Sequence, residues 1–127
     1  MKQIKERSPQ NNSSTVSVKQ LGPHAGAEVH GLDATKPLSQ DNLTIIRSAL
    51  MEYGVIVFRD QDITRKQQAE FTANFGVLTV HPFSPHLDEM PEMIVLDNDG
   101  ENPPLSTDVW HSDETFRLEP PMGTVLR

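Results

Sequence analysis

The chain has 127 residues, which is enough for one modest domain with a single core. It carries 18 acidic residues against 11 basic ones, and this balance argues against a binder of nucleic acid or of anionic membranes, because phosphate contact requires basic patches. It contains no cysteine, which excludes disulfides, thiolate catalysis and cysteine-based zinc sites. Any metal must therefore be held by His, Asp or Glu.

The N-terminal residues are polar and contain proline and asparagine, which predicts a flexible tail (1–15) ahead of the domain (16–127). The tail lacks the hydrophobic stretch of a secretory signal, and no apolar run in the chain approaches the length that crosses a membrane. We therefore expect a cytoplasmic protein with no membrane partner.

Short strands are predicted in the first half of the domain. Val16–Leu21 and Ala27–Leu32 are strand candidates, and the alternation of the second places His30 on its solvent face. Val55–Phe58 is a continuous apolar, β-branched run, which is typical of a strand buried on both faces.

Two helices are predicted from their terminal residues. Ser39 is a suitable N-cap for the first helix, which Gly54 ends in a left-handed conformation. The second begins at Thr64, with a glutamine three residues on in capping-box position, and Gly76 is expected to end it. Its two phenylalanines are expected to form the packed face.

Three further strands are predicted in the second half, at 77–80, 93–96 and 122–127, with proline-containing loops between them. Mixed helices and strands, with most strands late in the chain, predict an α+β fold with a β-rich core. The last apolar run has no polar tail after it, which favours the N-terminal part of a longer protein.

The candidate site is the pattern His111-Ser112-Asp113. Residues two apart in an extended segment project to one face, so an imidazole nitrogen and a carboxylate oxygen could reach the same metal ion. With a second histidine, such a pair forms the facial triad of non-haem Fe(II) oxygenases. Trp110 and Phe116 are expected to bury the flanks of the segment, which increases the need for a polar partner. Alternatively, Asp113 orients His111 or caps a turn, and Trp110 is only a core anchor.

The residues around this pattern resemble the taurine dioxygenase family of Fe(II)/2-oxoglutarate-dependent oxygenases, which also includes the 2,4-dichlorophenoxyacetate dioxygenases. The resemblance extends through nearly everything after the tail, and its co-ordered motifs are more specific than His-x-Asp alone. The matching stretches are LGPHAGAEVHG (21–31), GVIVFRDQ (54–61), FG (75–76), NPP (102–104) and VWHSDETF with EPPMGTVLR (109–127).

This resemblance implies a double-stranded β-helix (jelly-roll) oxygenase core with flanking helices, truncated in this chain, in which His111 and Asp113 are two of the three iron ligands. Fe(II), O2 and 2-oxoglutarate would hydroxylate a small anionic substrate and release succinate and CO2. The third ligand, a histidine, and the arginine and threonine that bind 2-oxoglutarate would lie beyond residue 127. We expect the fragment alone to be inactive and the full-length protein to be a homo-oligomer.

The resemblance also implies a substrate site with His81, Thr107 and Glu114. His81 matches a histidine that contacts the sulfonate in taurine-cleaving members, and an imidazole is a suitable donor to an anion. Alternatively, His81 anchors the Pro82–Pro85 turn. Ser84 and Thr107 stand where taurine-cleaving members carry a tyrosine and an asparagine. Glu114 replaces an apolar residue and would repel an anion unless it points away, so another sulfonate, an alkyl sulfate or a carboxylate is as plausible as taurine.

Two other functional classes remain as alternatives. A non-catalytic fragment or remnant could act as a binding or interaction domain that retains the strands without the downstream ligands. Metal-dependent hydrolysis is disfavoured, because zinc hydrolases usually require three protein ligands and the sequence offers only two.

Overall fold

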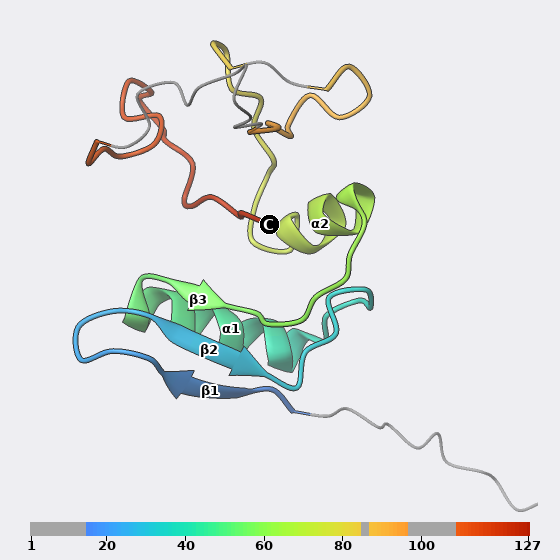
Figure 1. The fold of residues 1–127 in the computed structure, drawn as a ribbon, viewed down its shortest axis with the longest axis vertical. Coiled ribbons are helices and arrows are strands. Elements are labelled where there is room, and N and C mark those ends of the chain that lie inside the picture. The colour runs from blue at the N-terminus through green and yellow to red at the C-terminus, as the bar shows by residue number, and fades with distance from the viewer. Residues whose placement is uncertain (1–14, 85–86, 97–108) are drawn as a thin grey trace, which may run out of the picture. The chain divides into compact units, whose positions relative to one another are not determined.

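The computed structural model describes residues 15–84, 87–96 and 109–127. The chain divides into two compact units, Met1–Ile63 and Thr64–Arg127 (Figure 1). The regular elements of the described residues are β1 (Ser17–Gln20), β2 (Ala27–His30), α1 (Gln40–Tyr53) and β3 (Ile56–Val57) in the first unit and α2 (Arg65–Thr72) in the second. Nearly all of the predicted tail lies outside the described residues, so its flexibility stays a prediction.

The first unit contains a three-stranded sheet in the order β1-β2-β3. β1 runs antiparallel to β2, with Ser17 opposite His30, and β3 runs parallel to β2, with Ala27 opposite Ile56. The turn between β1 and β2 uses Gly26 at a φ of 89°, a conformation that favours glycine. The three strands predicted in the first half are therefore present, each shorter than expected. The expected burial of the third on both faces is wrong, because β3 lies at the edge of this sheet and its two residues are only half-buried.

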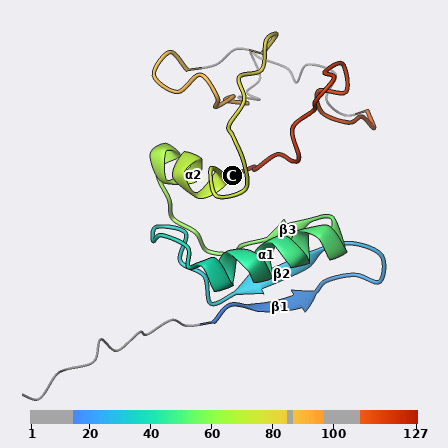
Figure 2. The ribbon, with the colours of Figure 1, turned by 180° about the vertical axis from the view of Figure 1, so that it is seen from behind.

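Helix α1 lies against one face of this sheet (Figure 2). Its N-cap is Ser39, whose side chain accepts a hydrogen bond of 3.2 Å from the amide of Asn42. Gly54 caps the other end at a φ of 71°, and its amide donates to the carbonyl of Leu50. Both predicted helix ends are confirmed, because each depends on bonds within a single turn.

The hydrophobic core described by the structure lies mainly in the first unit. Its buried apolar residues are Val16, Ala27, Val29, Ala34, Ile46, Ala49 and Ile63. In β2 the alternation is as predicted, because Ala27 and Val29 point inward while His30 is exposed. On the outer face, Nε2 of His30 lies 3.5 Å from Oε1 of Glu28, whose other carboxylate oxygen lies 3.6 Å from Nε of Arg59.

Helix α2 begins with the predicted capping box. The hydroxyl of Thr64 accepts from the amide of Gln67 at 3.3 Å, and the Gln67 side chain accepts from the amide of Thr64 at 2.8 Å. Of the two phenylalanines predicted for its packed face, Phe71 is buried, and its ring centroid lies 5.6 Å from that of Phe75, which lies past the end of the helix.

The prediction that Gly76 ends this helix is wrong, because the helix already ends at Thr72. The cause is Asn74, whose side-chain amide donates to the carbonyls of Glu70 (3.0 Å) and Phe71 (2.9 Å). Those two carbonyls belong to the last turn of the helix, and the Asn74 side chain helps to satisfy them, together with the Asn74 backbone amide, which donates to Phe71 at 3.2 Å.

The three strands predicted in the second half are also wrong. Residues 77–80, 93–96 and 122–127 have irregular backbone. The β-structure among the described residues of the second unit is limited to an isolated antiparallel bridge between Leu87 and Met90. A β-strand requires a neighbour to accept and donate its backbone hydrogen bonds, and none of these runs has one among the described residues. The α+β class is confirmed, with its sheet in the first unit instead of the second.

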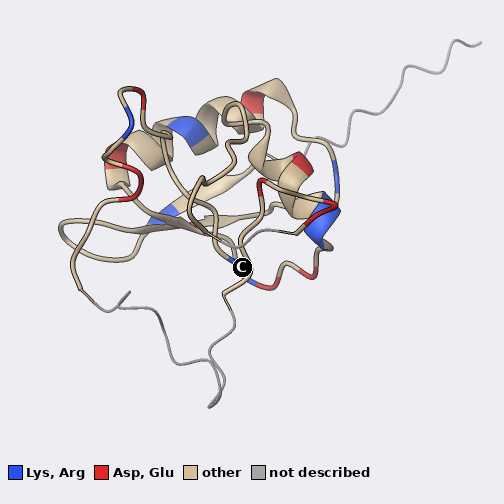
Figure 3. Ribbon diagram, turned by 90° about the horizontal axis from the view of Figure 1, so that it is seen from above, with Lys and Arg blue, Asp and Glu red and all other residues tan. Residues whose placement is uncertain are grey.

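Charged residues of both signs are interspersed along the described ribbon (Figure 3). Within the described ranges, no helix combines the length and the apolar character that crossing a membrane requires.

Candidate metal site

His111 and Asp113 come together in the second unit, as the sequence predicts. Nε2 of His111 lies 3.3 Å from Oδ1 of Asp113, and the other ring nitrogen, Nδ1, lies 2.7 Å from the carbonyl oxygen of Val109. A carbonyl oxygen can only accept a hydrogen bond, so Nδ1 carries the hydrogen. In a neutral imidazole this leaves the lone pair of Nε2 facing the carboxylate. A metal ion placed between two such electron-rich atoms is stabilised by both of them.

The spacing of these two atoms fits a shared metal ion. Two ligands that bind one divalent ion at about 2.1 Å and at right angles lie about 3 Å apart, close to the observed separation. Both side chains are about half exposed (53% for His111 and 54% for Asp113), so an ion can reach them from solvent. A ring nitrogen bonded to a backbone carbonyl is also the usual arrangement around a metal-binding histidine.

Thr124 orients the carboxylate of Asp113. Its hydroxyl donates a hydrogen bond of 2.8 Å to Oδ2, the oxygen that does not face His111. This contact leaves Oδ1 as the oxygen available to a metal ion. No local pattern indicates this contact, because Thr124 lies within a run that the sequence predicts as a strand.

No cluster of three or more His, Asp or Glu side chains suited to a metal occurs within residues 15–84, 87–96 and 109–127. The described part of the chain therefore offers His111 and Asp113 as a pair of candidate ligands, and the position of a third ligand stays a prediction.

The expected burial of the flanking aromatic residues is wrong. The side chain of Trp110 is fully exposed, and that of Phe116 is 58% exposed. The segment after His111 forms a turn instead of a sheet strand, so among the described residues neither ring has a layer beneath it to pack against. The ring of Phe116 instead meets the rings of Phe83 and His81 edge to face, with centroid distances of 5.5 and 6.0 Å.

His81 holds the turn that follows it. Its Nδ1 accepts hydrogen bonds from the amides of Phe83 (3.2 Å) and Ser84 (3.0 Å), which confirms the turn-anchoring alternative. These two bonds fix the neutral ring in the form with hydrogen on Nε2, so this nitrogen is a donor. The anchoring role is thus compatible with a contact to an anion. Thr107 lies outside the described residues.

Glu114 forms an ion pair with Arg117, three residues later. The Glu114 side chain is 10% exposed and that of Arg117 is 30% exposed. The adjacent guanidinium offsets the negative charge of the carboxylate, so the repulsion of an anionic substrate expected from the sequence is reduced. Arg117 was not predicted as a site residue, although the Glu-x-x-Arg spacing was visible.

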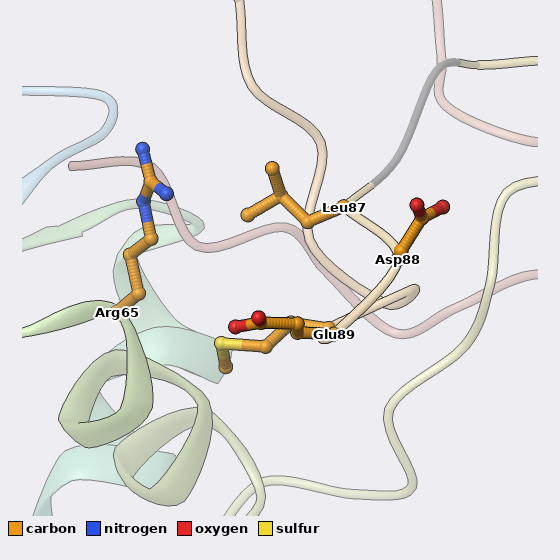
Figure 4. A pocket seen from close by; sticks show the side chains of 5 residues that line it. Arg65, Leu87, Asp88 and Glu89 are labelled. Carbon is orange, nitrogen blue, oxygen red and sulfur yellow. The ribbon is translucent and has the colours of Figure 1, made fainter.

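A shallow pocket lies elsewhere in the second unit, between the start of α2 and the turn at residues 87–90 (Figure 4). Its lining residues are Arg65, Leu87, Asp88, Glu89 and Met90. Two carboxylates accompany its single guanidinium, and none of the predicted site residues contributes to it.

The motifs and the paired histidine and aspartate are typical of non-haem iron oxygenases. Residues 17–127 match the family described as taurine catabolism dioxygenase TauD, TfdA family, and the chain belongs to this family.

Individual relatives agree with this assignment. The chain is 31% identical over 119 residues to the alpha-ketoglutarate-dependent dioxygenase cnsM of Penicillium expansum, in a match that covers 85% of this chain and 33% of that protein. It is 29% identical over 119 residues to an alkylsulfatase of Acinetobacter baylyi, with coverage of 93% and 37%. A crystal structure of a taurine dioxygenase from Burkholderia xenovorans is 40% identical, with a TM-score of 0.56 over 61% of this chain and 28% of that one. The chain thus spans about a third of the length of the curated relatives it matches.

Proposed function

We propose that the protein containing this chain is an Fe(II)/2-oxoglutarate-dependent dioxygenase, which hydroxylates a small anionic substrate with O2 and releases succinate and CO2. The observation that carries the proposal is the pair of His111 Nε2 and Asp113 Oδ1 at 3.3 Å in a chain that belongs to the TauD, TfdA family. The relative from Penicillium expansum is itself named an alpha-ketoglutarate-dependent dioxygenase, which supports the same co-substrate.

In this proposal His111 and Asp113 hold two coordination positions of the iron, and a histidine from elsewhere in the full-length protein holds a third. Bound Fe(II) supplies the activation of O2, together with 2-oxoglutarate. The chain's own residues orient the ligands, because the carbonyl of Val109 fixes the imidazole ring and Thr124 fixes the carboxylate. The complete protein is proposed to form a jelly-roll core, to assemble as a homo-oligomer and to reside in the cytoplasm.

The proposed substrate carries one anionic group, which accepts a hydrogen bond from Nε2 of His81. Two relatives, named a taurine dioxygenase and an alkylsulfatase, support a sulfonate or an alkyl sulfate, and a carboxylate presents similar acceptor oxygens. Because the charge of Arg117 offsets that of Glu114, an anionic group can bind near His81 with less repulsion. Thr107 is retained as a proposed lining residue from the sequence.

Succinate formation by the full-length protein tests this function. The protein is incubated with Fe(II), 2-oxoglutarate and a panel of sulfonates, alkyl sulfates and aryloxy carboxylates, and succinate is quantified by mass spectrometry. We expect substrate-dependent succinate, lost in His111→Ala and in Asp113→Ala. The exposed residues His24 and Asp62 provide matched controls, whose alanine variants should retain activity. Full activity in the His111→Ala and Asp113→Ala variants would refute the metal assignment, and a folded wild-type protein without succinate would favour the non-catalytic alternative.

A further inference from the structure

Two loops that carry different parts of the proposed site are joined directly within the second unit. Nη2 of Arg117 donates a hydrogen bond of 2.7 Å to the carbonyl oxygen of Val80, and the same guanidinium forms the ion pair with Glu114. Glu114 directly follows Asp113 in the chain, and Val80 directly precedes His81. Each end of this connection is therefore one peptide bond from a proposed site residue.

The connection is made of groups that suit a fixed geometry. A guanidinium presents its donors in a rigid plane, so Arg117 can bond a carboxylate and a carbonyl at once without reorienting. The Glu114 carboxylate is mostly removed from water, which reduces solvent screening of the pair. The guanidinium also lies 5.9 Å from the centroid of the Phe116 ring, which packs edge to face against His81.

We propose that Glu114 and Arg117 are positioning residues that hold the anion-binding His81 at a fixed distance from the metal ligands His111 and Asp113. This set of contacts (Glu114, Arg117 and the Val80 carbonyl) is the Arg117 bridge. The inference rests on the proposed function for the roles of the residues that it joins. By fixing the separation between the anion donor and the metal, the bridge determines which carbon of a bound substrate faces the oxidising centre.

Kinetics of the full-length enzyme test the bridge. Arg117→Gln removes the ion pair, and we expect kcat/KM for the anionic substrate to fall about tenfold or more, because a misplacement of about 1 Å can cost ~10²-fold. The KM for 2-oxoglutarate and the affinity for Co(II) should stay unchanged. A matched control is Lys66→Gln, which breaks the exposed Lys66–Glu70 pair on α2 and should alter none of these values.

A second readout does not depend on turnover. The ring nitrogens of His81 report its hydrogen bonds in ¹⁵N NMR spectra, and we expect them to shift in Glu114→Gln and in Arg117→Gln. The double variant should shift them no further than either single variant, since both remove the same connection. Should Arg117→Gln fail to fold, Arg117→Lys replaces it. Lysine keeps the charge but lacks the planar fork, so the same changes are expected at smaller size.

The outcomes separate the two proposals. If the wild-type protein forms no succinate, the proposed function fails, while the NMR comparison still tests the bridge. Unchanged His81 ring signals in the Arg117 variants would overturn the bridge, whatever the activity of the wild-type protein. In an active enzyme, an unchanged kcat/KM for the anionic substrate would overturn it as well.

Discussion

Replacement of Thr124 by valine should weaken metal binding. Valine has nearly the shape of threonine but lacks the hydroxyl that donates to Oδ2 of Asp113 at 2.8 Å. Without this bond the carboxylate can rotate, and Oδ1 no longer has a fixed direction toward an ion shared with His111. The change therefore acts on the orientation of a proposed ligand and leaves both ligands in place.

The size of this effect follows from the exposure of the carboxylate. A hydrogen bond to a charged group contributes about 1.5–3 kcal/mol. Asp113 is 54% exposed, so water replaces part of the lost interaction and the lower end applies. A loss of about 1.5 kcal/mol corresponds to a roughly tenfold weaker metal affinity.

Anaerobic calorimetry of the full-length protein with Co(II) measures this affinity. Thr124→Ser keeps a hydroxyl and should bind Co(II) nearly as tightly as the wild-type protein. Thr44→Val removes a hydroxyl that donates to the carbonyl of Gln40 in α1 and serves as the matched control. An unchanged affinity in Thr124→Val, or an equal loss in Thr124→Ser, would refute the orienting role.

Three further predictions concern stability and titration of the first unit and of α2. Ile46 is the largest fully buried side chain among the described residues. Its replacement by alanine should destabilise the protein by about 2–5 kcal/mol, and urea unfolding that shows no loss would contradict the assigned core. Thr64→Ala removes the capping box of α2 and should cost about 1 kcal/mol, measurable as faster amide exchange in the first turn of the helix. The side-chain hydrogen bond from Lys36, followed by those from Thr35, lowers the pKa of Asp33 from 3.8 to about 2. Because the folded-state pKa is depressed, the stabilisation is complete above pH 3.8 and is lost as pH falls to about 2. Carboxyl NMR titration should show this low pKa, and Lys36→Met should raise it; an unchanged pKa in that variant would show that the assigned cause is wrong.

Local signals in the sequence were sufficient for the ends of α1 and the start of α2. Ser39, Gly54 and Thr64 each act through hydrogen bonds to residues three or four positions away. The alternation in β2 was also sufficient, because successive side chains of a strand point to opposite faces. In these cases the interactions that determine the local structure lie within the same few residues whose pattern predicts it.

The strand predictions for the second half failed because a strand depends on interactions outside its own segment. An apolar, β-branched run indicates that a segment can form a strand, but only a neighbouring strand completes it. The same limit applies to Trp110, whose aromatic character predicted burial while the described residues place no layer over it. The prediction for the C-terminal end of α2 failed for a local reason. The side chain of Asn74 bonds to carbonyls of the last helical turn before the chain reaches Gly76.

The sequence predicts the pairing of His111 with Asp113, because side chains two residues apart in an extended segment point to one face. The contacts around this pair follow only from the tertiary structure. Thr124 reaches Asp113 across 11 positions, and Arg117 reaches Val80 across 37. Contacts of this kind depend on how loops close in space, and loop closure is governed by chain entropy and packing instead of by any local pattern of residues.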